Sequence, residues 1–129
     1  MAITQVRPRR KVTGSRYKDL RKKKQFELGR DPTLTKIGEK RKKLIRIMSG
    51  KHKEITLVAD IINVIDPKSK KSMQAKIKTV VENPANRHFV RRNILTKGTI
   101  VETDKGKVKI TSRPGQEGTL NGILVSQWL

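Results

Sequence analysis

The groups in this sequence best suited to chemistry are cationic, because 32 lysines and arginines stand against 11 carboxylates and give a formal net charge of +21. Arginine offers a fork of donors that matches a phosphate group, and lysine adds a mobile point charge. Residues 1–53 hold 19 cations and four acids, so they carry +15, whereas residues 54–129 carry +6. On a surface that is merely solvated, positive and negative side chains would be balanced. The imbalance favours binding to a nucleic-acid backbone.

The predicted phosphate-binding residues lie in two parts of the chain. In the first part they are Arg7, Arg9, Arg10, Lys11, Arg16, Arg21, Lys22, Lys23, Lys24, Arg30, Lys36, Lys40, Arg41, Lys42 and Lys43. In the second part they are Arg87, Arg91 and Arg92. Two interpretations of this second group stay open, and both can be true together. In one, Phe89 and Val90 are core residues with exposed arginines beside them; in the other, the segment contacts RNA directly.

Catalysis and metal binding find little support in the sequence. There is no cysteine, and His52 and His88 are 36 positions apart, so local spacing assembles no metal site. No glycine-rich phosphate loop is present. Asp66 and Asp104 fall in predicted turns, where local hydrogen bonding explains them. We therefore predict no catalytic residue, no cofactor and no metal ion.

Helix-breaking residues separate the cation groups near the N-terminus. Gly29, Pro32 and Gly38 would each interrupt a continuous helix, since proline lacks a donor and glycine adds backbone entropy. We therefore predict an extended basic arm, residues 1–43, that contains one short helix at residues 16–28. Ordering such an arm costs about 1–2 kcal/mol per residue, so its folding is expected to be coupled to binding.

The remaining chain, residues 44–129, predicts a mostly β fold, a small β-barrel of about six strands. Short runs of apolar and β-branched residues are separated by turn residues there. The predicted strands are residues 44–48, 54–65, 74–81, 98–103, 107–111 and 119–126. Closure into a barrel would remove the exposed edges that invite aggregation.

Three connections have specific signals. Asp104-Lys105-Gly106 predicts a three-residue hairpin loop with a positive φ at its glycine. Arg113-Pro114-Gly115-Gln116 fits a type II turn, with proline second and glycine third. After a turn at residues 83–86, the segment RHFVRRNIL, residues 87–95, predicts a helical turn.

The sequence contains no apolar run of the length that a secretion signal or a membrane span requires. Its basic segments also lack the apolar face that binding to a membrane surface needs. We therefore expect a soluble cytoplasmic protein without a membrane partner.

Three stretches resemble a known family: ELGRDPTLTKIGEKRKK at residues 27–43, ENPANRHFVRRNILTKGTIVET at 82–103, and KVKITSRPGQEGTLNGIL at 107–124. They are similar to small-subunit ribosomal protein eight of the eukaryotic and archaeal type, in its shorter archaeal form. The resemblance covers nearly the whole chain. The motif positions carried over are Gly29, Arg30, Thr35, Lys36, Ile37, Gly38, Lys40, Arg41, Asn83, Pro84, Asn86, Arg91 and Arg92.

This resemblance implies a non-enzymatic component of the small ribosomal subunit, with a β-barrel body and extended basic segments against ribosomal RNA. The implied partners are that RNA and neighbouring ribosomal proteins, and the implied location is the ribosome. Charge alone does not distinguish RNA from DNA, so a free-standing, chromatin-type nucleic-acid-binding protein is the alternative. With RNA as the partner, the helix breakers would let the arm follow an irregular surface and reach separate rows of phosphates.

Overall fold

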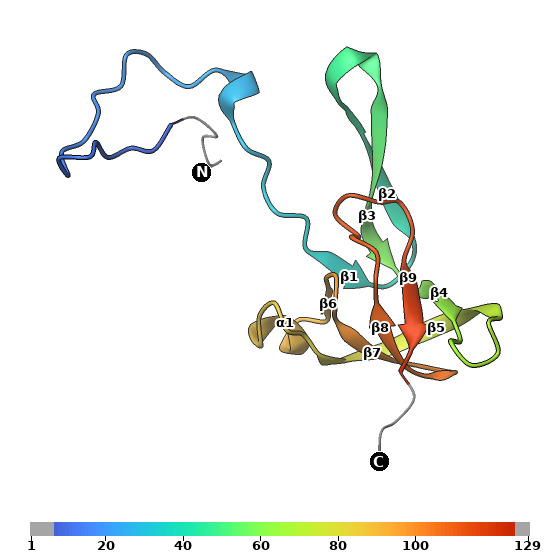
Figure 1. Ribbon diagram of the computed structural model, residues 1–129. Helices are drawn as coiled ribbons and strands as arrows, with labels where there is room; N and C mark the ends of the chain where they lie inside the picture. Colours follow the sequence, from blue (N-terminus) through green and yellow to red (C-terminus); the bar gives the residue numbers. More distant parts are fainter. Residues whose placement is uncertain (1–6, 126–129) are drawn as a thin grey trace. The chain divides into compact units, whose positions relative to one another are not determined.

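The computed structural model describes residues 7–125 of the chain (Figure 1). It divides into two compact units, unit 1 up to Pro32 and unit 2 from Thr33 onward. The boundary between arm and barrel domain at residue 44 stays a prediction. Residues 33–43 lie in the unit that contains the sheets.

A loop that folds back on itself is the first feature of unit 1. The Tyr17 N–H donates to the Arg9 carbonyl at 3.0 Å, and Arg10 and Arg16 form an isolated β-bridge. Gly14 lies in the turn of this loop with a φ of +85°, a conformation that glycine adopts without strain. The loop therefore holds basic residues from its two sides opposite each other.

The helix predicted at residues 16–28 is wrong, because the structure has only the short 3-10 helix Gln25–Glu27 there. Six cations between residues 16 and 24 repel one another. Leu20, an apolar residue within the expected helix, is 97% exposed, so packing does not offset that repulsion.

Unit 2 contains a closed β-barrel and a second sheet. The barrel has the strand order β4-β5-β7-β8-β9, with β4 parallel to β9 and the other neighbours antiparallel. Its strands are β4 Ile61–Ile65, β5 Ser72–Glu82, β7 Ile100–Thr103, β8 Gly106–Ile110 and β9 Asn121–Leu124. The predicted mostly β fold with a small barrel is confirmed, and the barrel has five strands in place of about six.

The second sheet has the order β2-β3-β1-β6, with β1 parallel to β3 and the other pairs antiparallel. Its strands are β1 Thr35–Ile37, β2 Arg41–Arg46, β3 His52–Ala59 and β6 Ile94–Leu95. The helix α1, His88–Arg91, lies between β5 and β6 in the chain. It confirms the helical turn predicted within residues 87–95.

Alternation along the barrel strands builds the core. Ile62 and Val64 of β4, Val101 of β7 and Val108 of β8 are all 0% exposed. Burial of a side chain of this size contributes about 1.5–3 kcal/mol. Gly122 of β9 makes room for this packing, because a Cβ there would lie 2.5 Å from Val108 Cγ1. The core therefore depends on close contact between β8 and β9.

The single strand predicted at residues 54–65 is divided at Asp60 into the end of β3 and all of β4. The Asp60 carbonyl accepts the Ile77 N–H at 2.8 Å, which fixes the point of division. The two halves belong to different sheets. Apolar residues occur on both faces of this stretch because each half buries its own side chains.

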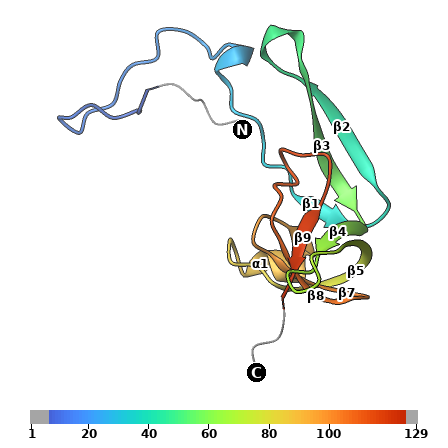
Figure 2. The same cartoon turned by 45° about the vertical axis from the view of Figure 1, so that its right-hand side comes forward.

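β2 and β3 form a long hairpin that extends away from the barrel (Figures 1 and 2). The Ile47 N–H donates to the Lys51 carbonyl at 2.8 Å, and residues 48–50 form a 3-10 turn between them. The strand predicted at residues 44–48 lies here, but it begins earlier, at Arg41, and ends at Arg46. A run of cations concealed its start.

The connection between β8 and β9 packs against this hairpin. The Thr56 N–H of β3 donates to the Pro114 carbonyl at 2.9 Å, and Thr56 Oγ1 donates to the Glu117 carbonyl at 3.0 Å. The Lys53 ammonium also donates to the Gln116 side chain. These bonds attach the base of the hairpin to the connection between β8 and β9.

Two turns differ in type from the prediction. Residues 113–116 form a hydrogen-bonded turn, but Gly115 lacks the positive φ that a type II turn requires. Between β7 and β8 the loop has two residues rather than three, because Thr103 pairs with Gly106. Gly106 has a φ of +119°, as predicted. The other predicted strands are confirmed as β5, β7, β8 and β9, although residue 126 lies outside the described residues.

Candidate nucleic-acid interface

All 18 cations predicted to bind phosphate are exposed in the structure. They lie in four places: the loop of residues 7–17, the segment of residues 21–30, the strands β1 and β2, and the region of α1. Exposure alone does not separate binding residues from ordinary surface residues. A cation whose charge is already paired within the protein is less available to phosphate, so the partners of each residue are the more useful criterion.

Tyr17 organises the loop of residues 7–17. Arg7 Cζ lies 3.8 Å from the centre of the Tyr17 ring, and Lys11 Nζ lies 5.5 Å from it. Such cation–π contacts are worth about 0.5–1 kcal/mol each at exposed sites. Arg10 Nη1 also donates to the Gly14 carbonyl at 3.1 Å. A ring or a carbonyl cancels no charge, so the loop presents several full positive charges close together.

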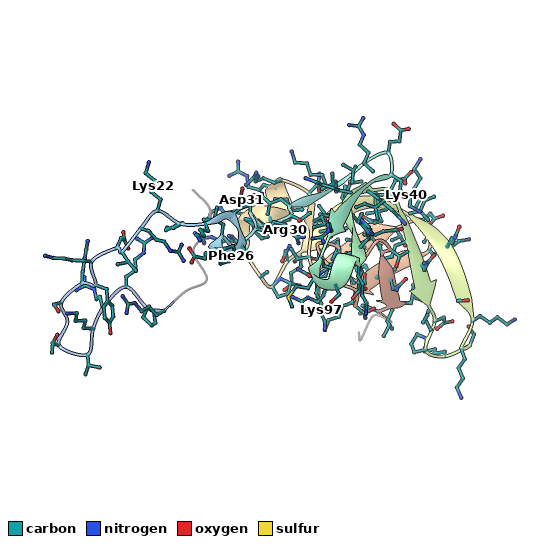
Figure 3. All side chains as sticks on the ribbon, turned by 90° about the horizontal axis from the view of Figure 1, so that it is seen from above. Lys22, Phe26, Arg30, Asp31, Lys40 and Lys97 are labelled. Carbon is teal, nitrogen blue, oxygen red and sulfur yellow. The ribbon has the colours of Figure 1, made fainter. Side chains whose placement is uncertain are left out.

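Glu27 holds the segment that follows. Its carboxylate accepts two bonds from Arg21, at 2.7 and 3.1 Å, and one from the Lys24 N–H at 3.0 Å. These donors lower the pKa of Glu27, with the Arg21 guanidinium as the main cause. Arg21 is thus paired within unit 1. Lys22 and Lys23 make no hydrogen bond or ion pair with the described residues, and the Lys22 side chain extends away from the ribbon in Figure 3.

Five predicted cations lie in or beside β1 and β2, namely Lys36, Lys40, Arg41, Lys42 and Lys43. Lys42 Nζ lies 2.8 Å from Glu54 Oε2 on β3, and this bond lowers the pKa of Glu54. The strand β2 is an end strand of its sheet, where cations also discourage pairing with another chain. Among the described residues, the four cations other than Lys42 form no ion pair, although the charge of Lys40 also helps to lower the pKa of Glu54.

A buried asparagine fixes the chain on either side of α1. Asn83 is 5% exposed; its Nδ2 donates to the Ile94 carbonyl at 3.2 Å, and its Oδ1 accepts from Thr96 Oγ1 at 3.1 Å. Asn86 Oδ1 accepts the His88 N–H at 2.9 Å at the start of the helix. The motif residues Asn83 and Asn86 therefore position the helix, and the arginines around it are the groups that face outward.

Arg87, Arg91 and Arg92 are exposed, whereas Phe89 and Val90 are half-buried. Val90 packs against the barrel core. Arg87 and Arg91 are four positions apart, a spacing that brings side chains together on one side of a helical turn. The packing interpretation is therefore correct for Val90, and direct RNA contact by the arginines stays a prediction.

The residues considered for catalysis are dispersed. His52 lies on β3 and His88 on α1, and within residues 7–125 no three His, Cys, Asp or Glu side chains gather in a way that could hold a metal ion. Asp66 accepts from the Lys68 N–H at 3.0 Å and from Ser69 Oγ at 2.8 Å. The Lys68 N–H is the main cause that lowers the pKa of Asp66. The predicted local role of Asp66 is confirmed.

Asp104 has a wider role than the sequence suggested. Its carboxylate accepts the N–H of Lys76 on β5 at 3.0 Å, and its own N–H donates to the Lys76 carbonyl at 3.2 Å. The turn between β7 and β8 is thereby attached to β5. The sequence predicts hydrogen bonds within the turn itself, because it does not reveal which strand lies beside the turn.

The predicted set leaves out other exposed basic residues. Among them are Arg46, Lys51 and His52 near the end of the β2–β3 hairpin and Lys97 after β6, which is labelled in Figure 3. The sequence pattern predicts a barrel strand at residues 44–48. For the three hairpin residues, the available signal was the absence of any acid from Lys40 to Lys53.

The fold and the exposed cations together define a class, a small basic β-barrel protein with additional basic segments. Among the helices of the described residues, none is long and apolar enough to cross a membrane. The model of the family "Ribosomal protein S8e" matches residues 4–125. The chain belongs to this family, and the resemblance noted in the sequence is confirmed.

Three relatives illustrate the similarity, and each is named small ribosomal subunit protein eS8. The one from Nanoarchaeum equitans is 52% identical over 122 residues, which cover 94% of this chain and 95% of that protein. The one from Methanosphaera stadtmanae is 51% identical over 125 residues, 97% and 99% of the two chains. The one from Methanocella arvoryzae is 49% identical over 117 residues, 91% and 94%.

Proposed function

We propose that this protein is a structural, non-enzymatic component of the small ribosomal subunit that binds its ribosomal RNA. Its place is the ribosome in the cytoplasm, beside other ribosomal proteins. Membership of the ribosomal protein S8e family and the names of the relatives support this assignment. The contacts assigned to RNA are those of the 18 predicted cations.

The observation that carries the RNA-binding part is the lack of internal partners for exposed positive charge. Arg21 and Lys42 lie in ion pairs, and Arg30 has a partner of its own. Among the described residues, the remaining predicted cations have no carboxylate within ion-pair distance. Charge of one sign at this density repels itself, and a polyphosphate relieves that repulsion.

Unit 1 is the part most dependent on such a partner. Its described residues are held by the Tyr17 loop and the Arg21–Glu27 pair, and neither buries a side chain fully. RNA phosphates would neutralise Lys22, Lys23 and the arginines of the loop, and counterions would be released. The breaks at Gly29 and Pro32 let the segment change direction along an irregular RNA surface.

The test is the salt dependence of binding between the full-length protein and a transcript of small-subunit ribosomal RNA. If about ten phosphates are neutralised, log affinity should fall against log salt with a slope of roughly −7 to −9. A slope near zero would contradict the proposal. A DNA duplex of equal charge serves as competitor, and equal or better displacement by DNA would favour the chromatin-type alternative.

A matched pair of variants sharpens this test. Lys22→Glu with Lys23→Glu reverses two unpartnered cations of unit 1, and we expect affinity for the transcript to fall about tenfold or more. Lys68→Glu with Lys71→Glu makes the same charge change in the exposed turn between β4 and β5, outside the predicted set. Equal losses in the two variants would mean that only net charge matters.

A further inference from the structure

The far half of the β2–β3 hairpin, residues 44–53, carries exposed side chains that the proposed function leaves unused. We call this segment the hairpin end. It lies at the part of the hairpin farthest from the barrel (Figures 1 and 2). The hydrogen bonds from Thr56 to the β8–β9 connection fix the hairpin near its base, so the end is presented on an anchored element.

The charge of the hairpin end is of one sign. Residues 44–53 contain three lysines and arginines, one histidine and no acid. Lys53 is occupied by its bond to Gln116. Arg46, Lys51 and His52 are exposed and make no side-chain hydrogen bond or ion pair with the described residues.

The strand register places two of these groups together. Arg46 of β2 lies directly opposite His52 of β3, so both side chains point to the same face of the hairpin. Side chains at such positions have Cβ atoms about 4.5–5.5 Å apart. A planar guanidinium and a planar imidazole side by side can each donate to a phosphate or stack on a base.

Apolar side chains accompany this charge. Met48 is 88% exposed and Leu44 is 65% exposed, while Ile47 is 40% exposed. Met48 lies in the turn itself, which the Ile47–Lys51 backbone bond closes at 2.8 Å. Met48 therefore presents an almost fully exposed apolar side chain at the tip, where it is available for contact. A thioether is polarisable and packs well on aromatic rings.

We infer that the hairpin end forms a second RNA contact, separate from unit 1, in which Arg46, Lys51 and His52 bind phosphates and Met48 packs on the face of an unstacked base. RNA is the occupant that the charge selects, since no acid in the segment would oppose a phosphate backbone. Bases in loops and bulges of RNA offer the flat faces that the tip requires. This inference rests on the proposed function, and it adds a surface to it.

The experiment separates the ionic and apolar parts of the contact in the full-length protein with the same RNA transcript. Arg46→Ala with Lys51→Ala should flatten the slope of log affinity against log salt by about two units. Met48→Ser should weaken binding about two- to tenfold with the slope unchanged. Lys105→Ala with Lys107→Ala, at the exposed β7–β8 turn, is the charge-matched control and should leave the slope nearly as it was.

The outcomes distinguish this inference from the proposed function. If the wild-type protein shows the steep salt slope but the hairpin variants match the control, the inference is overturned and the proposed function stands. If the wild type binds the transcript without salt dependence, the proposed function itself fails. Unfolding temperatures equal to wild type show that the exposed substitutions leave the fold intact.

A second measurement tests the nature of the occupant. Met48→p-benzoylphenylalanine places a photo-crosslinking group at the tip in assembled small subunits. A crosslink to ribosomal RNA supports the inference. A crosslink to a ribosomal protein, or none above the level of the same group at Lys105, would overturn it.

Discussion

Different interactions stabilise the interior of unit 2 and the fold of unit 1. The thirteen buried hydrophobic residues of the described chain all lie in unit 2, where a closed barrel surrounds most of them. In residues 7–32 no residue is buried, and the main contacts are cations over the rings of Tyr17 and Phe26, a fold-back loop and one bidentate ion pair. Each of these contacts is worth little in water.

The two units obtain their order from different sources. The barrel excludes water from its own interior and so needs no partner. Unit 1 has a preferred local geometry, but too little buried surface to offset the entropy of ordering its backbone. We therefore expect unit 1 to become ordered through RNA, whereas unit 2 is ordered beforehand.

The largest expected difference is in amide hydrogen exchange. Without RNA, amides of β8 and β9 should exchange several orders of magnitude more slowly than in an unfolded chain, while those of residues 7–32 should be nearly unprotected. Mass spectrometry of exchanged peptides measures both in one sample. Strong protection of residues 7–32 in the free protein would contradict coupled folding and binding.

Removal of core volume should affect only one unit. Ile62→Ala empties part of the barrel interior, where the side chain is 0% exposed, and should lower the free energy of unfolding by about 2–5 kcal/mol. Leu20→Ala is the control in unit 1, where the side chain is 97% exposed, and should leave stability unchanged. Urea denaturation measures both. A similar loss from the two variants would show that unit 1 packs on a core.

A smaller effect is expected at the junction of β1 with β3. Thr35 Oγ1 is buried and donates to the Thr56 carbonyl at 2.7 Å. Thr35→Val keeps the shape and removes this donor, so it should cost about 1–3 kcal/mol. Thr119→Val, at an exposed threonine, is the control. Thermal unfolding that does not distinguish the two variants would show that the bond contributes nothing.

The smallest effect concerns acid pH and the Arg21–Glu27 pair. The pKa of Glu27 lies below its ordinary value of 4.5, so the contribution of the pair is present above that value and is lost as the pH falls through the lowered pKa. An NMR titration of the Glu27 carboxyl measures its midpoint. Arg21→Gln should move this midpoint upward, and identical midpoints would exclude the pair in solution.

Much of unit 2 could be predicted from the sequence, because its strands follow local patterns. Alternation and turn residues identified the strands that became β5, β7, β8 and β9. The division at Asp60 escaped prediction, since it depends on which sheet each half joins. The four cations before Leu44 concealed the start of β2, because their strand propensity is poor. The strand begins there nevertheless, since pairing with β3 outweighs that propensity.

The sequence predicted which residues make up the candidate site better than it predicted how they are paired and positioned. Charge counting identified 18 cations that are all exposed. It could not reveal that Arg21 and Lys42 are paired, because their partners Glu27 and Glu54 meet them only after folding. It also missed the hairpin end, whose exposure depends on how far β2 and β3 extend beyond the barrel.

The pairing of β4 with β9 has a consequence for how the protein is made. Asn63 and Asn121 are partners in this parallel ladder, although 58 positions separate them. During synthesis the barrel cannot close until its last strand has been translated, and closure over such a distance is slow to nucleate. The basic residues 7–32 therefore leave the ribosomal tunnel before the barrel can close, so they meet the solvent while their scaffold is still unfolded.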